Sequence, residues 1–298
     1  MPISIKFISI FFLFCCSNSL AIADGHKKAE LKSQKLSDNI HLITGKGGNI
    51  AVSIGEDGTF LIDDKFAPMT DAILNIIKKA GGDTPKFVIN THWHGDHTGG
   101  NENLGKKGSI IVAHANVRQR LSEENFISAF NMKAPPQPKA ALPVITFTQE
   151  LRFHLNNDTI DLQHIANAHT DGDSIIFFQK DNILHTGDLF FNGFYPFIDV
   201  EHGGSLKGML TASEILLKLA NDDTKIIPGH GPMATKKDLS DFRDMLDVAY
   251  KRLSALKKDG KSLEQALTMN PLKTLDAEWS DGLFKTNKWI TLIYNGLD

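Results

Sequence analysis

A short stretch near position 90 concentrates side chains that bind metal ions. Three of the chain's twelve histidines and one aspartate fall within six residues. They are His92, His94, Asp96 and His97. The preceding run 87–90 is apolar and rich in β-forming residues, which predicts a short buried strand. Because the glycines that follow break regular structure, we expect these side chains on a loop at the end of that strand.

The spacing within this cluster favours two metal positions side by side. Side chains two residues apart lie on the same side of an extended backbone, so His92 and His94 can face one cation. Asp96 and His97 follow a glycine that permits a sharp turn, and they can face a second position. Imidazole and carboxylate suit zinc and related divalent ions. The alternative, a polar turn with fortuitous histidines, is disfavoured by so dense a cluster.

The pattern His-x-His-x-Asp-His after an apolar strand resembles the signature loop of the metallo-β-lactamase superfamily. Three later segments resemble the rest of that family's pattern. His169 lies on a loop just before the apolar run 174–178, and Asp188 follows a glycine at the end of an expected strand. His230 stands in Pro-Gly-His-Gly after another apolar run. The resemblance covers nearly all of the expected mature chain up to Pro232.

The resemblance implies a fold and a ligand set. The fold is an αββα sandwich of two mixed β-sheets with outer helices, and its metals lie at one edge. The ligands implied for the first metal are His92, His94 and His169. The ligands implied for the second are Asp96, His97 and His230, with Asp188 as a bridge. The implied cofactor is two Zn²⁺ per chain, with iron or manganese as alternatives.

The reaction implied is hydrolysis of a small ester, thioester, lactone or amide by a metal-bridging hydroxide. Two divalent cations roughly 3.5–4 Å apart lower the pKa of a shared water from 15.7 to about 7. Asp96 is placed to orient this nucleophile and to accept a proton. The sequence contains no Gly-x-Ser-x-Gly elbow that would supply a serine nucleophile instead.

Antibiotic hydrolysis by a β-lactamase is an alternative on the same ligands. In the commonest true metallo-β-lactamases a cysteine stands at the position of Asp188, and most lack a histidine like His97. Many also carry a carboxylate-binding lysine where this chain has Phe191. These departures weigh against β-lactams, and the ligand set is more similar to glyoxalase II and lactonases. The chain has no obvious basic cluster for a glutathione thioester.

Two further function classes remain open. A mononuclear iron dioxygenase acting on persulfides, a known variant of the fold, would use chiefly the His92, His94, His169 and Asp188 set; the intact second site argues against it. A non-catalytic binding module is disfavoured because every ligand position is filled. Metal analysis separates the three classes, which predict two zinc ions, one iron ion and no metal.

The aromatic run 190–197, directly after Asp188, has two interpretations. It can pack in the core, or it can form an apolar wall above the metals. In the second case Phe191 contacts the substrate, and Asn192 or Tyr195 offers it a hydrogen bond. The sequence does not choose between them.

The elements that position these residues follow from periodicity. Strands are expected at 40–43, 49–54, 59–62 and 109–113, with a hairpin turn at Asp57-Gly58. A helical period covers 69–80 and ends at a glycine pair, and a further helix is expected at 116–121. Segments 144–147, 151–155 and 159–165 suggest a meander. His154 and His164 in it are expected to be structural. His185, beside the bridge, is expected either to support the metal ligands without touching the metals or to pack in the core. The run 236–258 has one apolar helical face, 263–267 continues the helical C-terminal third, and 289–292 is expected to close the fold.

Segment 134–143 contains four prolines, so it can be neither a helix nor a central strand. Two interpretations are open: a surface loop near the mouth of the site, or a tie between layers. The segment 24–37 is polar and is expected to be a lead-in.

The N-terminus predicts export. Lys6 is the only charge before Asp24, the run 7–16 is apolar, and Ala21-Ile22-Ala23 is a small-x-small cleavage pattern. These are the marks of a secretory signal peptide at 1–23. The apolar run is too short for a membrane span, which needs about 20 apolar residues. We expect a periplasmic or secreted protein that is not attached to the membrane after cleavage. Both cysteines lie in the signal, which excludes disulfides and thiolate ligands from the mature chain.

Composition bounds the remaining possibilities. The 298 residues are 41% apolar and 22% charged, with a formal net charge of −3. This balance is typical of a globular protein, and we expect one domain over 24–298. Without a basic run interleaved with aromatics, nucleic acid is excluded as a partner. The expected partner is a small-molecule substrate, and the oligomeric state stays open.

Overall fold

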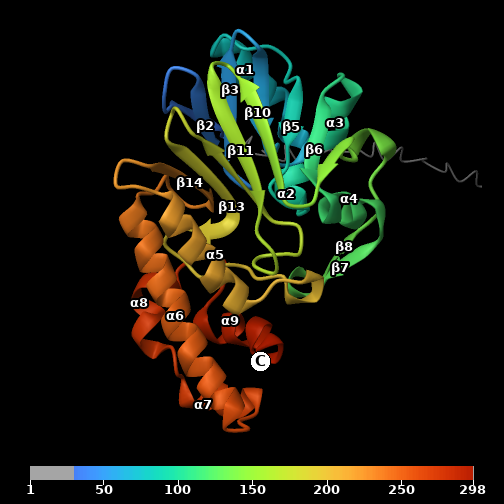
Figure 1. The fold of residues 1–298 in the computed structure, drawn as a ribbon. Coiled ribbons are helices and arrows are strands. Elements are labelled where there is room, and N and C mark those ends of the chain that lie inside the picture. Colours follow the sequence, from blue (N-terminus) through green and yellow to red (C-terminus); the bar gives the residue numbers. More distant parts are fainter. Residues whose placement is uncertain (1–29, 298) are drawn as a thin grey trace, which may run out of the picture.

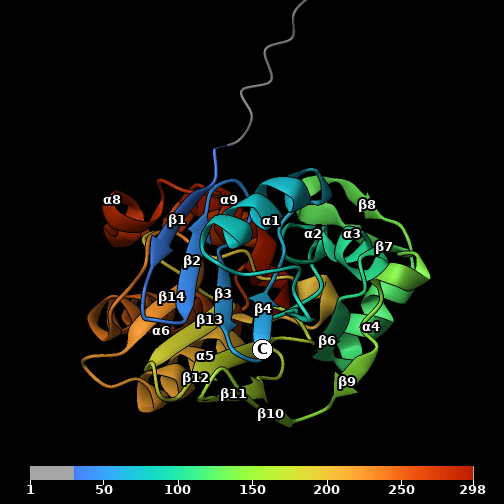
Figure 2. The same ribbon diagram turned by 90° about the horizontal axis from the view of Figure 1, so that it is seen from above.

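Two β-sheets pack face to face, with helices on their outer surfaces (Figure 1). The computed structural model describes residues 30–297, so the expected signal peptide at 1–23 lies outside the described residues. Figure 2 shows β3 (Ile50–Gly55) and β4 (Gly58–Ile62) between α1 (Thr70–Lys79) and strands of the second sheet. The predicted αββα sandwich is confirmed.

The first sheet has seven strands and changes from antiparallel to parallel at β4. Its antiparallel half is held in register by the Asp57-Gly58 hairpin, as predicted from the sequence. In spatial order the strands are β1 (Lys32–Lys35), β2 (Ile40–Thr44), β3, β4, β5 (Phe87–Ile89), β6 (Ile110–His114) and β9 (Ile145–Phe147).

The second sheet has five strands, of which the first four form an antiparallel meander and the last is parallel to its neighbour. Its strands are β10 (Glu150–Leu155), β11 (Asp158–His164), β12 (Ser174–Phe178), β13 (Ile183–Phe191) and β14 (Lys225–His230). A separate hairpin is formed by β7 (Asn125–Ile127) and β8 (Met132–Ala134). Apolar side chains from both large sheets, including Leu42, Ile62, Ile176 and Phe178, form the buried layer between them.

Helices cover the outer faces because their apolar stripes match those of the sheets. Ile73 and Ile77 of α1 pack against Val52 and Leu61 on the first sheet. On the second sheet the covering helices are α5 (Leu206–Leu219) and α6 (Lys236–Lys258). A capping box between Thr235 and Asp238 begins α6. The remaining helices are α2 (Gly95–Thr98), α3 (Asn101–Lys106), α4 (Ala115–Ser122), α7 (Leu263–Met269), α8 (Asp276–Trp279) and α9 (Thr286–Ile293).

Three expectations about the elements need correction. The segment 144–147 does not join the meander, because β9 pairs in parallel with β6 in the first sheet. Part of the expected lead-in forms the edge strand β1. Asp188 does not end its strand, since β13 continues to Phe191 past an irregularity in its pairing near Gly187. Among the described residues, no helix combines the length and apolarity needed to cross a bilayer.

Candidate metal centre

The seven predicted ligand side chains meet at one end of the sandwich, and both sheets contribute. Four come from the segment after β5 in the first sheet: His92 and His94 on the loop, Asp96 and His97 on α2. The other three come from the second sheet and are His169 between β11 and β12, Asp188 within β13, and His230 at the end of β14. Strand ends therefore bring together residues more than 130 positions apart in the sequence.

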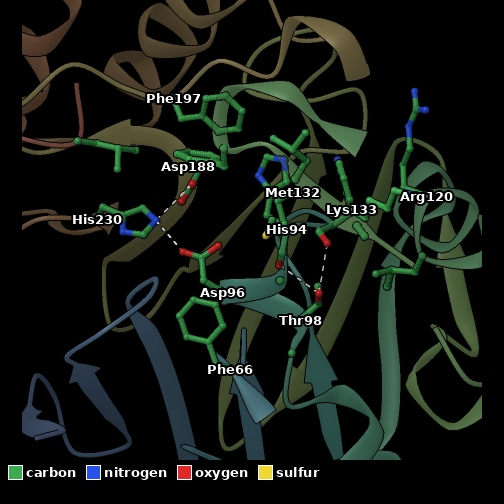
Figure 3. Close-up of a pocket in the computed structure, with 18 of the residues that line it drawn as sticks. Phe66, His94, Asp96, Thr98, Arg120, Met132, Lys133, Asp188, Phe197 and His230 are labelled. Carbon is green, nitrogen blue, oxygen red and sulfur yellow. Dashed lines mark hydrogen bonds and ion pairs between the residues drawn. The ribbon is translucent and has the colours of Figure 1, made fainter. Parts of the chain in front are cut away.

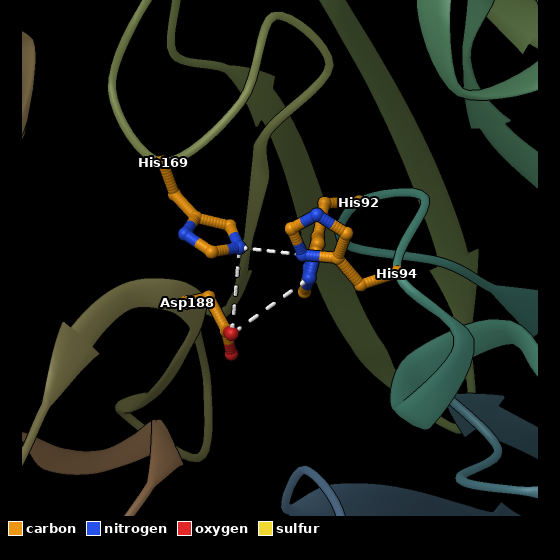
Figure 4. A group of neighbouring side chains, drawn as sticks. All are labelled: His92, His94, His169 and Asp188. Atoms are coloured by element: carbon orange, nitrogen blue, oxygen red, sulfur yellow. Dashed lines mark hydrogen bonds and ion pairs between the residues drawn. The ribbon is translucent and has the colours of Figure 1, made fainter. Parts of the chain in front are cut away.

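The first group consists of His92, His94, His169 and Asp188, whose ligand atoms all lie within 4.8 Å of one another. Figure 4 shows the three imidazole rings and the carboxylate pointing at a common space. His169 Nε2 lies 2.9 Å from His94 Nδ1. The Oδ2 atom of Asp188 lies 3.5 Å from His169 Nε2 and 3.8 Å from His92 Nε2. All four side chains are buried.

The second group, Asp96, His97 and His230, also keeps its ligand atoms within 4.8 Å. Asp96 Oδ2 lies 3.2 Å from His230 Nε2 and 3.7 Å from His97 Nε2. Asp188 faces this group as well, with Oδ1 at 3.0 Å from His97 Nε2 and Oδ2 at 3.4 Å from His230 Nε2. One carboxylate therefore stands between the two groups.

Two carboxylates outside the groups orient histidines from behind. Asp63 Oδ2 lies 2.7 Å from Nδ1 of His97, and Asp199 Oδ2 lies 2.8 Å from Nε2 of His94. A histidine that donates one ring N–H to a carboxylate presents its other nitrogen as a lone pair. His97 thus presents Nε2 and His94 presents Nδ1 to the centre.

The other two buried histidines are oriented in the same way by neutral groups. His169 Nδ1 lies 2.8 Å from the carbonyl oxygen of Phe197, and His92 Nδ1 lies 3.0 Å from the hydroxyl of Thr91. Both rings therefore present Nε2 to the first group. The ring orientations of the whole first group are consistent with one shared cation.

The sequence analysis did not identify Asp63 and Asp199 as partners of the metal ligands, although the position of Asp63 after a buried strand could have indicated such a role. Asp63 directly follows the buried strand β4, which lies beside the strand that leads to His92. It also accepts hydrogen bonds from the backbone N–H and the hydroxyl of Thr91, each at 2.8 Å. An aspartate at this strand end can tie the metal loop to the sheet. Asp199 carried no comparable signal, because it lies 105 residues from His94.

The electrostatics of the two groups differ. Burial lowers the pKa of His169 to about 4, so this ring is a neutral ligand at pH 7. Burial also acts on His230, but the carboxylates of Asp188 and Asp96 outweigh it and raise the pKa to about 9. Burial opposes the ionisation of Asp96, yet His97 and His230 hold its pKa at about 2. Positive charge in the second group is therefore favourable.

The donor atoms fit divalent cations. His92 Nε2 is buried and has no hydrogen-bond partner among the described residues, and the buried Asp188 Oδ1 has no well-aligned hydrogen bond there, only the ion-pair contact with His97 Nε2 at 3.0 Å. Buried polar atoms are normally paired, and both of these atoms face the space between ligands. Three imidazoles with one carboxylate, and two imidazoles with one carboxylate, are donor sets typical of zinc and related ions.

A glycine turn closes against the second group. The turn between β2 and β3 brings Gly48 so near to His97 that a Cβ on Gly48 would lie 2.1 Å from the ring carbon Cε1. Lys65, which is fully buried, donates a hydrogen bond from Nζ to the carbonyl oxygen of Gly48. Burial lowers the pKa of Lys65 to about 8, against the attraction of Asp96 and Asp63. The lysine therefore fixes the turn that packs on His97.

A cavity of about 680 Å³ opens onto the centre, and His94, Asp96, Asp188 and His230 contribute to its lining (Figure 3). Phe191, an expected substrate contact, lines it too. Parts of the proline-rich segment also lie at the cavity, namely Ala134, Pro135 and Gln137. The rest of the segment is tied to neighbouring helices, because Asn101 of α3 donates to the carbonyl oxygen of Ala141 and Arg118 of α4 to that of Pro143. Both interpretations of the segment therefore apply to part of it.

The other two expected substrate contacts lie away from the cavity. Asn192 donates to the carbonyl oxygen of Pro232 at 3.1 Å, so it holds the loop after His230. Tyr195 is fully buried and stacks on Trp289 with ring centroids 4.3 Å apart. The chain turns inward after Phe191, and Tyr195 therefore packs under the C-terminal helices rather than above the metal ligands.

The remaining singled-out histidines belong to neither group. His154 is exposed on β10, and His164 stacks on His114 at 3.7 Å between ring centroids. His185 is fully buried, with Nε2 3.2 Å from the carbonyl oxygen of Asn49. The burial of His185 and the stacking of His164 are typical of structural histidines, whereas the exposed His154 shows no such packing.

Comparison with known proteins gives the family. The sequence model described as the metallo-beta-lactamase superfamily matches residues 43–230. A probable metallo-hydrolase of Methanocaldococcus jannaschii is 27% identical over 218 residues, which are 71% of this chain and 96% of that protein. A type 2 metallo-beta-lactamase of Elizabethkingia meningoseptica is 25% identical over 186 residues, 57% of this chain and 67% of its own. The solved metallo-beta-lactamase from Pontibacter korlensis shares the fold, with a TM-score of 0.59 at 20% identity over 73% of this chain and 99% of that one. Together with the two ligand groups, the family match shows that this chain belongs to the metallo-β-lactamase superfamily and is a metal-dependent hydrolase.

Proposed function

We propose that this protein is an exported dinuclear zinc hydrolase that cleaves a small ester, thioester, lactone or amide. The observation that carries the proposal is the position of Asp188, whose two carboxylate oxygens face both ligand groups within 3.8 Å of four histidine nitrogens. A carboxylate shared between two donor sets is suited to a pair of cations. Three protein ligands besides this bridge leave each cation room for water or substrate.

The site residues would have two roles, binding the cations and accepting a proton. His92, His94 and His169 would hold one cation, and Asp96, His97 and His230 would hold the other. When bound, two such cations supply an acidified water as nucleophile and polarise the scissile carbonyl. Asp96 stays ionised at neutral pH because its pKa is held at about 2, and it lines the cavity. It is therefore available to orient the nucleophile and to accept a proton.

The substrate range in this proposal is supported by Phe191. Its ring stacks on His230 with centroids 5.1 Å apart, so an aromatic face stands beside the second group. The resemblance to the superfamily implies a carboxylate-binding lysine at this position in many β-lactamases. An apolar ring there does not select for the carboxylate of a β-lactam.

Export is supported by the sequence of the first 23 residues. Cleavage after Ala23 would leave Asp24 as the N-terminus of a periplasmic or secreted protein that lacks cysteine. N-terminal sequencing of the active protein, purified from a fractionated culture, tests this. Active protein that begins at Met1 would contradict export and leave the hydrolase proposal intact.

Metal analysis followed by a substrate panel tests the chemistry. We expect two zinc ions per chain and turnover of chromogenic esters or lactones that stops when the metal is chelated and returns when zinc is added. One iron ion and no hydrolysis would contradict the proposal in favour of the dioxygenase class. Preferential hydrolysis of nitrocefin would replace the proposed substrate range with β-lactams.

A further inference from the structure

The cavity beside the metal centre is walled by large apolar side chains that come from distant parts of the chain. Six of them are Phe66, Ile127, Phe130, Met132, Phe194 and Leu283. They come from the segment after β4, the β7–β8 hairpin, the loop after β13 and the C-terminal segment before α9. At about 680 Å³, the cavity falls in the usual range of 300–1,000 Å³ for small-molecule sites. It exceeds what a reacting ester or lactone group alone would fill.

The β7–β8 hairpin covers one side of this cavity, and hydrogen bonds hold its tip in place. The side-chain hydroxyl and backbone N–H of Ser128 donate to the carboxylate of Glu201, at 2.7 and 3.1 Å. Phe130, also at the tip, packs edge-on against Phe197 with centroids 4.9 Å apart. It also stacks near Phe284 at 5.9 Å. The hairpin is thus held over the metal centre by contacts with two other segments.

Side-chain alternation along β7 separates an inner face from an outer face. Ile127 lines the cavity and is buried, whereas its neighbour Phe126 is 46% exposed and does not line it. The inner face remains partly open to solvent, since Phe130 and Met132 line the cavity and are still 41% and 44% exposed. An exposed apolar patch rimmed by polar groups marks a binding surface.

The polar groups of the cavity lie at its two ends. The metal ligands occupy one end, and Figure 3 shows Arg120 and Lys133 on the side away from His230. Arg120 is paired with Asp171 at 2.7 Å. Between these ends the walls are mainly apolar, and the hydroxyl of Thr98 there donates to the backbone carbonyl oxygens of Trp93 and His94. A ligand that fills the cavity must therefore present an apolar segment next to the group that reacts.

We propose that the substrate is a carboxylic ester or thioester with an apolar acyl chain, and that this chain lies between the metal centre and the β7–β8 hairpin. The inference rests on the proposed hydrolase function and adds the substrate class. The acyl carbonyl lies at the metal end and the chain runs under Phe130 and Met132. The chain covers the apolar side chains that water touches in the free protein.

A series of p-nitrophenyl esters tests the inference, because the leaving group stays constant while the acyl chain grows from acetate to octanoate. We expect kcat/KM of the zinc-loaded protein to rise with each added methylene, by up to about fourfold per step. Phe130→Ala and Met132→Ala should flatten this rise. Phe126→Ala is the matched control on the same hairpin and should leave the rise unchanged.

Binding of saturated fatty acids, measured by calorimetry, separates the inference from the proposed function. Decanoate should bind more tightly than butyrate to the zinc-loaded protein, with a negative heat-capacity change, and Phe130→Ala should remove the difference. Hydrolysis at a rate independent of chain length would overturn the inference and leave the hydrolase intact. Chain-length-dependent binding without any ester hydrolysis would contradict the hydrolase and support the cavity assignment. Equal effects of Phe126→Ala and Phe130→Ala would also overturn the inference.

Discussion

Nδ1 of His97 donates to Oδ2 of Asp63 across 2.7 Å, and both side chains are fully shielded from solvent. The carboxylate comes from the end of β4 and the imidazole from α2, so the contact joins a sheet strand to the metal loop. It fixes the ring orientation that turns Nε2 of His97 toward Asp188 and His230.

The first prediction concerns this contact. Asp63→Asn replaces a carboxylate by an amide of nearly the same size, so His97 loses the partner that fixes its tautomer. We expect the affinity of the second cation to fall about 10–100-fold, the usual cost of losing such a partner. Competition against a chromophoric zinc chelator measures it.

The matched control is Asp199→Asn, which removes the equivalent partner of His94. It should weaken the first cation and spare the second. If the two variants lose the same cation, the assignment of Asp63 and Asp199 to separate ligand groups is wrong.

The second prediction concerns the ligands themselves. His92→Ala should abolish the first site, while His230→Ala should abolish mainly the second, so that each variant retains about one zinc ion of two. Removing a ligand should lower the affinity for its cation at least as much as removing a carboxylate behind a ligand, which costs about 10–100-fold. Mass spectrometry under native conditions counts the ions. His154→Ala, an exposed histidine of β10, should retain both.

The third prediction concerns Asp96. Asp96→Asn keeps the size of the side chain but cannot accept a proton, and its N–H₂ donates where the carboxylate accepted. Turnover should fall about 10²–10⁴-fold, the typical contribution of a general base. The rate must be measured together with zinc content, because the second cation can weaken as well. Asp83→Asn, at an exposed position after α1, is the control. Near-normal turnover at full zinc content would exclude Asp96 as the proton acceptor.

The fourth prediction concerns pH and the buried lysine. Burial lowers the pKa of Lys65 to about 8 in the folded protein, whereas the unfolded chain keeps a pKa of about 10.4. Between these values the unfolded state binds more protons, so the free energy of unfolding rises with pH. Relative to Lys65→Met, the wild type should gain about 3 kcal/mol from pH 7 to pH 10.5.

Urea unfolding of both proteins after removal of metal by a chelator measures this difference, because bound cations would add their own charge near Lys65. Lys78→Met, which removes an exposed lysine of α1, should follow the wild-type curve. A constant difference between wild type and Lys65→Met across the pH range would show that the folded lysine titrates normally.

The sandwich and the seven ligand positions were predictable from the resemblance to the superfamily, because each ligand follows or lies in an apolar strand and its local motif could be matched. The helix 236–258 and the Asp57-Gly58 hairpin were predictable from their own local patterns. The roles of Asp63 and Asp199 were not, since each depends on a partner far away in the chain. The β7–β8 hairpin was missed because its three-residue strands are too short to show alternation. The place of Tyr195 stayed open because an aromatic run has the same pattern beside a cavity and in a core.

The two sheets supply different ligands to the same centre, so ions bound there would cross-link the two halves of the sandwich. Ions that bind only the folded chain stabilise it by mass action, by about 4.1 kcal/mol at a free concentration 1,000 times the dissociation constant. The melting temperature should therefore rise with free zinc and fall with a chelator. Hydrogen exchange should slow most on zinc binding at the ends of β5, β13 and β14. If the protein is exported as proposed, its mature chain has no disulfides, and the metal supply of the compartment would set resistance to unfolding as well as catalytic rate.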